Sequence, residues 1–152
     1  MGKKVINRIL NILCLIVLIG ITIYLIIRWN AMPKLIPTHY DFAGNVDSYG
    51  SKGSVLMMPI MSWVLYILIT VLEMFPALWN TGVKVTEENK FRVYAILRLM
   101  LDIIKFIMVV SFAYTTICSV EFMPLGAWFT FVEVGTIFLT IILCLVKLYK
   151  AR

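Results

Sequence analysis

Charged side chains are scarce in this sequence. Only 14% of the 152 residues are Asp, Glu, Lys or Arg, whereas 62% are hydrophobic. A domain that faces water on all sides needs about 25–35% charged residues on its surface. The shortage therefore excludes a soluble protein of ordinary composition.

Cysteine and histidine are equally few. The three cysteines (Cys14, Cys118 and Cys144) all lie in or at the ends of apolar stretches, and no CxxC pair occurs. An odd number of cysteines outside the polar loops predicts no disulfide framework. His39 is the only histidine, and the sequence has no nucleophile elbow, phosphate loop or metal pair. We therefore expect no enzymatic activity, no cofactor and no metal.

Long apolar runs are what the sequence has in abundance. Four of them are nearly uninterrupted: Ile9–Ile27, Val55–Leu78, Ile96–Cys118 and Leu125–Val146. As a helix, the shortest would reach about 29 Å at 1.5 Å per residue, close to the hydrocarbon thickness of a bilayer. The pattern predicts an all-α integral membrane protein, a single domain over residues 1–152 with four transmembrane helices.

The basic residues predict how these helices are oriented. Nine Lys or Arg residues lie on the side of the two chain ends, against three (Arg28, Lys34 and Lys52) on the other side. The positive-inside rule then places both termini in the cytosol and the loop 28–54 outside. The net charge of +6 is thus a topology signal, and we expect no nucleic-acid partner. The nine are Lys3, Lys4, Arg8, Lys84, Lys90, Arg92, Lys147, Lys150 and Arg152.

The outer loop is the one polar stretch between apolar runs, and residues 36–53 read IPTHYDFAGNVDSYGSKG. Pro33 and Pro37 favour extended backbone before them, and Gly44 favours a turn. One interpretation is a compact cap whose polar groups satisfy its own backbone. The other takes His39, Asp41 and Asp47 as a cluster that accepts a proton, a cation or a peptide; both stay open on these residues alone.

This loop resembles a known motif. The string Pro37-Thr38-His39-Tyr40-Asp41, followed by Gly44, Asp47 and Tyr49-Gly50-Ser51-Lys52, is similar to the pattern at the start of SdpI-type proteins. These form the immunity family for a sporulation-delaying toxin and are common in Gram-positive bacteria. The resemblance implies a cell-membrane protein whose outer loop recognises a secreted peptide toxin or protects against it. Longer members carry a second membrane module, and we expect this chain to hold only the first. The candidate residues of the motif are Pro37, Thr38, His39, Asp41, Gly44, Asp47, Tyr49, Gly50 and Lys52.

Five ionisable residues lie inside the apolar runs, where an unpaired charge is costly: Glu73, Arg98, Asp102, Lys105 and Glu133. Arg98, Asp102 and Lys105 are spaced i, i+4, i+7 and share one helix face. Glu73 lies at a similar depth and can pair with Arg98 or Lys105. Glu133 lies deeper, with only Lys105 in reach. These charges either hold the helices together or form a proton or ion path from Glu133 through Lys105 and Asp102.

Three functions follow from these patterns. The loop motif favours a protective or receptor-like membrane protein that meets a secreted peptide toxin. The buried charges favour a small ion- or proton-coupled transporter. The expected lack of a second module favours an accessory subunit of another membrane protein. Besides the lipid bilayer, the candidate partners are therefore a peptide toxin or a second membrane protein.

Overall fold

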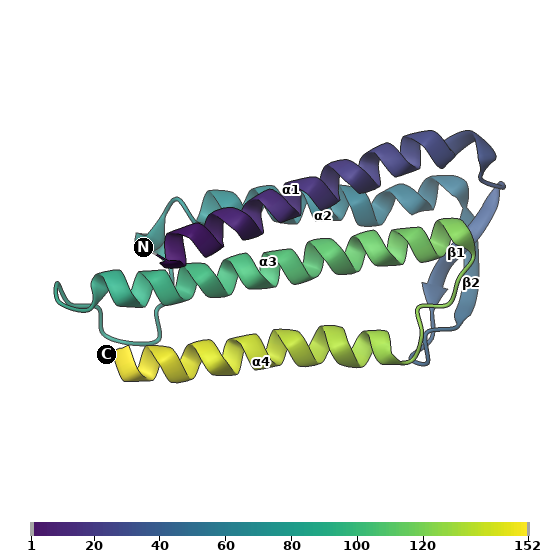
Figure 1. The fold of residues 1–152 in the computed structure, drawn as a ribbon. Helices are drawn as coiled ribbons and strands as arrows, with labels where there is room; N and C mark the ends of the chain where they lie inside the picture. The colour runs from purple at the N-terminus through teal and green to yellow at the C-terminus, as the bar shows by residue number, and fades with distance from the viewer. Residues whose placement is uncertain (1, 152) are drawn as a thin grey trace.

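The computed structural model describes residues 2–151, with side chains from Val5 onward. Four long helices form an elongated bundle, and a small β-hairpin covers one end (Figure 1). The helices are α1 (Gly2–Arg28), α2 (Met57–Leu72), α3 (Lys90–Glu121) and α4 (Trp128–Ala151). The residues Met1 and Arg152, and the side chains of Lys3 and Lys4, on which part of the orientation argument rests, lie outside this description.

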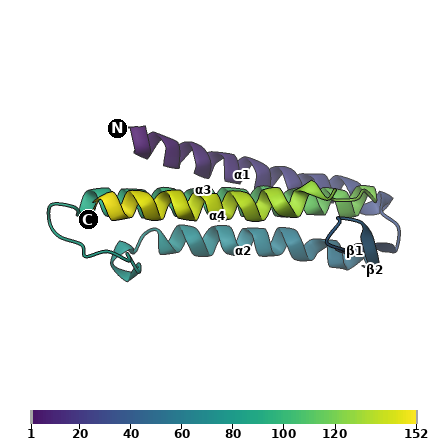
Figure 2. The same ribbon diagram turned by 90° about the horizontal axis from the view of Figure 1, so that it is seen from below.

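Helix α3 is the centre of the bundle. It packs against α1, α2 and α4, whereas α4 packs mainly on α3. Figure 2 shows α1 and α2 on either side of α3, with α4 laid along it. The charged residues on α3 can therefore point into the bundle, which is what their spacing on one helix face predicts.

Three helical stretches are long and apolar enough to cross a membrane: Val5–Ala31, Lys52–Leu72 and Trp128–Ala151. Large apolar side chains cover their outer surfaces, as Ile26, Ile67 and Phe138 illustrate. A helix that presents such side chains outward suits lipid rather than water. The chain is thus an integral membrane protein. Helix α3 is also long enough at 32 residues, but Arg98, Asp102 and Lys105 interrupt its apolar run.

The helices differ in length from the apolar runs that predict them. Helices α1 and α3 extend beyond their runs at both ends, because a helix continues past the hydrocarbon layer wherever its sequence allows. Helix α2 ends at Leu72 instead of Leu78. Pro76 explains this end, because it has no N–H to donate to the Leu72 carbonyl and its ring disfavours helical backbone just before it. Helix α4 begins at Trp128, after Gly126 has taken a positive φ of 82°.

The prediction of an all-α fold is incomplete, because the outer loop folds as an antiparallel hairpin. Strand β1 (Leu35–Tyr40) pairs with β2 (Val46–Ser51), in a register that places Leu35 opposite Ser51 and Tyr40 opposite Val46. Short 3₁₀ turns flank it, η1 (Trp29–Ala31) and η2 (Lys52–Leu56), and a third, η3 (Pro76–Leu78), lies at the other end of the bundle. Both chain ends lie at that other end, opposite the hairpin (Figure 1).

Candidate functional site: the hairpin and the buried charges

The hairpin is anchored to the bundle through its first strand. Ile36 is fully buried, in one apolar cluster with Leu25 of α1, Val55 of η2 and Val120 of α3. Further along the strand, the Tyr40 hydroxyl lies 3.3 Å from the Ser119 hydroxyl on α3. Burial raises the pKa of Tyr40. Strand β1 is thus fixed to three elements of the bundle.

The two glycines of the motif have structural roles. Gly44 adopts a φ of +81°, and a Cβ there would lie 2.7 Å from the backbone nitrogen of Gly126. The Gly44 carbonyl accepts a 2.8 Å hydrogen bond from the Leu125 N–H, so the turn of the hairpin docks onto the α3–α4 connection. A Cβ on Gly50 would lie 2.8 Å from the Thr38 methyl group on the opposite strand. Glycine is needed at both positions because a backbone or side chain approaches this closely.

Three motif side chains point into solvent instead. The His39 Nδ1 and Asp47 Oδ1 atoms lie 2.6 Å apart across the hairpin, and their side chains are 69% and 43% exposed. Tyr49 is also exposed, at 58%. These groups provide a hydrogen-bonding pair and an aromatic ring on the surface that covers the end of the bundle.

Asp41 does not join His39 and Asp47. Its carboxylate accepts hydrogen bonds from Asn45, including a 2.8 Å bond from the backbone N–H. These bonds, led by that N–H, hold the pKa of Asp41 below its ordinary value. The predicted three-residue cluster is therefore a His39–Asp47 pair beside a self-contained turn. Within residues 2–151, no three His, Cys, Asp or Glu side chains group as metal ligands.

Below the hairpin, a belt of polar contacts joins α1 to α3. Arg28 forms a 2.8 Å ion pair with Glu121, and the Tyr24 hydroxyl donates a hydrogen bond to the same carboxylate. The bond from Tyr24, with the charge of Arg28, lowers the pKa of Glu121. The Lys52 ammonium lies 4.6 Å from the centre of the Trp29 ring, a cation–π contact. Tyr24 and Glu121 are 97 residues apart, so no local sequence pattern predicts their contact.

A cavity of about 380 Å³ lies between the hairpin and the ends of α2 and α3. Hydroxyl groups dominate its polar lining, from Thr38 and Tyr40 on the hairpin and Thr115 and Ser119 on α3, and Met57 adds an apolar wall. His39 reaches its edge. The cavity offers neutral hydrogen-bonding groups next to the exposed motif residues. Nothing in the sequence pattern pointed to it, because its walls come from three separate elements.

The buried charges form a second polar region, centred on Lys105. The Lys105 ammonium lies 2.8 Å from Glu73 and 3.1 Å from Asp102, and all three residues are buried. It also donates hydrogen bonds to Asn11 on α1 and Thr70 on α2. Lys105 therefore ties together three helices, with two acids to balance its charge.

Asn11 is the member that sequence reasoning did not assign. Its amide donates to Asp102 Oδ1 at 2.6 Å and its carbonyl accepts from Lys105 at 2.8 Å. The second oxygen, Asp102 Oδ2, is buried and has no hydrogen-bond partner among the described residues. An uncharged polar residue in an apolar helix is a weak sign of a buried polar cluster. The depth of Asn11 in its helix nevertheless matches that of the buried charged residues.

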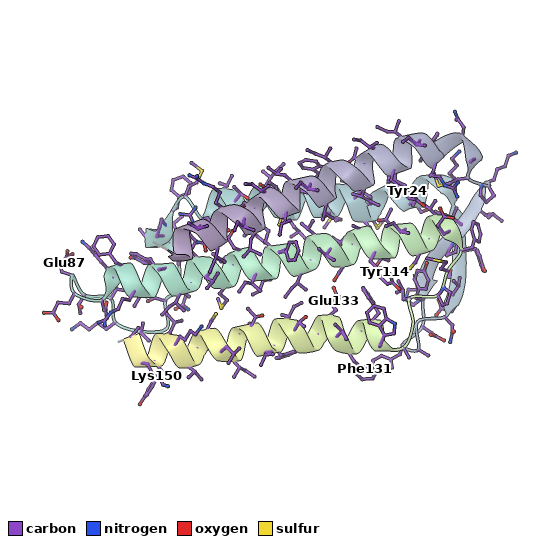
Figure 3. The ribbon with its side chains drawn as sticks, viewed as in Figure 1. Tyr24, Glu87, Tyr114, Phe131, Glu133 and Lys150 are labelled. Carbon is purple, nitrogen blue, oxygen red and sulfur yellow. The ribbon has the colours of Figure 1, made fainter. Side chains whose placement is uncertain are left out.

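The other two predicted members lie at or beyond the edge of this cluster. Arg98 is half exposed and lies 4.0 Å from Glu73. It lines an open cavity of about 540 Å³ with Glu73, Asn11 and Arg8, at the end of the bundle opposite the hairpin. Glu133 lies on the side of α4 that faces α3 (Figure 3) and is partly exposed. Within the part of the chain that the structure describes, it forms no ion pair.

Comparison with known proteins adds one finding. A family model described as a domain of unknown function (DUF1648) matches residues 16–62. No curated protein and no solved structure matches the chain significantly. The matched segment runs from the second half of α1 through the hairpin into the first turns of α2, so it contains the whole loop motif. Over this third of its length, the chain is similar to that family.

Proposed function

We propose that the chain is a toxin-immunity protein of the SdpI type, whose hairpin meets a secreted peptide outside the cell. In this proposal four helices cross the membrane and both termini lie in the cytosol. Two features support the orientation. The Lys and Arg residues are concentrated on one side, and both chain ends lie at the end of the bundle opposite the hairpin.

The observation that carries the proposal is how the motif residues divide between two tasks. Pro37, Gly44 and Gly50 are buried or in tight contact and shape the hairpin. His39, Asp47 and Tyr49 are exposed and make no contact that the hairpin needs for its anchoring. Exposed residues on a rigid support suit recognition of a partner.

The chemistry of this surface suits a peptide. The His39–Asp47 pair can donate and accept hydrogen bonds, and Tyr49 offers an aromatic face with a hydroxyl group. The hydroxyl-lined cavity under the hairpin can receive a side chain next to that pair. A peptide with amide groups and apolar side chains can use all three.

The experiment that tests the proposal is survival under toxin challenge. A sensitive Gram-positive host expresses the wild type, His39→Ala or Ser48→Ala at equal membrane levels and is exposed to secreted peptide toxins. Ser48 is the matched control, because it is exposed and pairs with His39 in the register but lies outside the motif. Protection is expected from the wild type and Ser48→Ala and not from His39→Ala. If none of the three protects, this chain alone does not confer immunity.

One observation favours a second function, a small ion- or proton-coupled transporter. Asp102 Oδ2 is buried and has no hydrogen-bond partner within residues 2–151. The open cavity at the far end reaches Glu73, a direct contact of Lys105. An intramembrane carboxyl group of this kind is a common element of proton relays. A transporter would lose proton-coupled flux in liposomes on Asp102→Asn or Glu133→Gln and would keep it on His39→Ala. The opposite pattern would favour immunity.

A further inference from the structure

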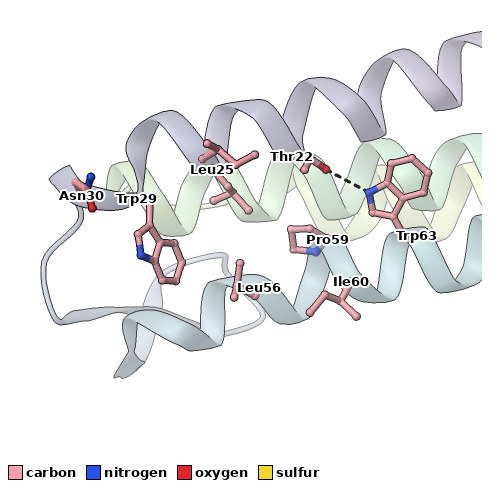
Figure 4. A pocket seen from close by; sticks show the side chains of 9 residues that line it. Thr22, Leu25, Trp29, Asn30, Leu56, Pro59, Ile60 and Trp63 are labelled. Carbon is pink, nitrogen blue, oxygen red and sulfur yellow. Dashed lines mark hydrogen bonds between the residues drawn. The ribbon is translucent and has the colours of Figure 1, made fainter.

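A groove of about 490 Å³ opens between α1 and α2 near the hairpin. Figure 4 shows its walls, with Leu25 on α1 and Trp29 of η1 facing Leu56 of η2 and, at the start of α2, Pro59 and Ile60. Ile26 and Ile60, which also line it, are well exposed, so the groove opens sideways from the bundle. Both walls belong to stretches that are apolar enough to cross a membrane, and the groove therefore opens toward lipid.

Among residues 2–151, the two polar side chains deep in the groove, Thr22 and Trp63, are bonded to one another. The Trp63 indole N–H donates to the Thr22 hydroxyl at 3.2 Å (Figure 4). That hydroxyl donates in turn to the Leu18 carbonyl. A polar ligand would find no free partner there, whereas a hydrocarbon chain would lose nothing by entering.

The mouth of the groove carries positive charge. Trp29 lines it, and the Lys52 ammonium lies 4.6 Å above that ring. The backbone N–H of Lys52 donates a hydrogen bond to the backbone carbonyl of Lys34. A second lysine therefore lies beside Lys52 at the base of the hairpin. Within residues 2–151, neither lysine side chain forms an ion pair.

The acids at this end of the bundle are engaged elsewhere. Asp47 contacts His39, Glu121 contacts Arg28, and Asp41 accepts from Asn45. The free charge near the groove is therefore positive, next to an apolar slot at membrane depth. All the lining residues except Trp63 also lie within residues 16–62, the segment that matches the family model.

We propose that this groove binds one acyl chain of an anionic phospholipid, with the phosphate held by Lys52 and assisted by Lys34. The occupant is a lipid rather than a peptide or a second copy of the chain, because hydrocarbon tails surround these walls at that depth and the mouth complements an anionic headgroup. The proposal does not depend on the immunity role and holds for any function of the hairpin.

Native mass spectrometry of the full chain, released from detergent with equimolar phosphatidylglycerol and phosphatidylcholine of identical acyl chains, tests this. One retained phosphatidylglycerol per chain is expected. Its preference over phosphatidylcholine should be about fivefold, equivalent to about 1 kcal/mol for one lysine at an anionic headgroup. Lys52→Gln should bring the ratio close to one. Lys84→Gln, an exposed lysine at the other end of the bundle, should leave it unchanged.

A second pair of variants tests the position of the acyl chain. Ile60→Trp fills the groove and should abolish lipid retention, whereas Ile67→Trp, on an exposed part of α2 outside the lining, should not. Circular dichroism confirms that both variants keep their helices. Equal retention of the two lipids, a ratio unchanged by Lys52→Gln, or a dimer in place of the lipid adduct would each overturn the proposal.

Discussion

Two polar side-chain pairs in this protein have similar distances and opposite surroundings. His39 and Asp47 lie 2.6 Å apart on the exposed hairpin, whereas Lys105 and Glu73 lie 2.8 Å apart in the middle of the bundle. An exposed pair contributes about 0–1 kcal/mol, because water solvates its members nearly as well when they separate. Removing one member of a buried pair costs about 3–5 kcal/mol, because the other charge stays behind without water.

The difference explains what each region is suited to do. The hairpin pair joins residues eight apart in sequence, on strands that other contacts already hold. The Lys105 cluster joins three helices that are far apart in the sequence. The first pair is free to exchange its partner for a ligand, while the second fixes how the helices pack.

The largest effect is expected for Lys105→Met. It leaves Glu73 and Asp102 buried without their shared cation, so the free energy of unfolding should fall by about 3–5 kcal/mol. Thermal unfolding of the purified protein in detergent measures this. Lys147→Met, at an exposed site on α4, is the control and should melt like the wild type.

The same cluster gives a sharper test. Adding Glu73→Gln and Asp102→Asn to Lys105→Met removes the uncompensated charges, so the triple variant should recover much of the loss. If Lys105→Met alone unfolds like the wild type, the cluster does not hold the helices together. The contrast with the hairpin pair would then disappear.

Gly44→Ala should have the next largest effect. The left-handed backbone costs a residue with a Cβ roughly 1–2 kcal/mol, and this Cβ would also meet the Gly126 backbone at 2.7 Å. The turn should separate from the α3–α4 connection, which an increase in amide hydrogen exchange at Leu125 would report, since its N–H bonds to the Gly44 carbonyl.

Gly20→Ala provides the control for that prediction. Gly20 lies within α1, and a Cβ there would meet nothing within 4 Å. Replacing it should be neutral or stabilise the helix by roughly 0.5–1 kcal/mol. An equal loss at both positions would indicate that the docking of the turn contributes nothing specific.

The positions of the helices could largely be predicted from the sequence, because apolar runs are local signals. The orientation that the basic clusters predict stays a prediction. The similar depth of Glu73 and Lys105 in their apolar runs also predicts a contact that the structure contains. The all-α prediction leaves out the hairpin, although Ile36, Thr38 and Tyr40 before the turn at Gly44 are typical of a strand. The sequence predicts extended backbone and a turn separately, and a hairpin needs both in one element.

Other features could not be predicted, because they depend on how distant segments meet. The hydroxyl-lined cavity and the Tyr24–Glu121 bond bring together residues from separate elements. Asn11 has no charge to mark it, and its role appears only when α1 lies beside Lys105. The position of Glu133 likewise depends on α4, which packs mainly on α3.

His39→Ala should change stability by less than about 0.5 kcal/mol, because both members of its pair are exposed. Thermal unfolding next to Ser48→Ala checks this. The result makes the survival experiment interpretable, since a loss of protection without a loss of stability places the effect in recognition. A marked drop in melting temperature would instead show that the His39–Asp47 pair stabilises the hairpin. Its contribution to stability would then be closer to that of the buried cluster.

The smallest effect is expected from Asp41 at low pH. The Asn45 N–H holds the pKa of this carboxyl below its ordinary value, so the ionised form stabilises the turn. That contribution is present above the ordinary Asp pKa of about 3.9 and is lost as the pH falls through the lower, folded value. The Asn45 amide resonance, followed by NMR in detergent micelles, should therefore shift only in this acidic range, and the shift should vanish in Asp41→Asn. A titration at or above the ordinary Asp value would show that the bond does not persist in solution. The turn of the hairpin would then depend on Gly44 and its docking alone.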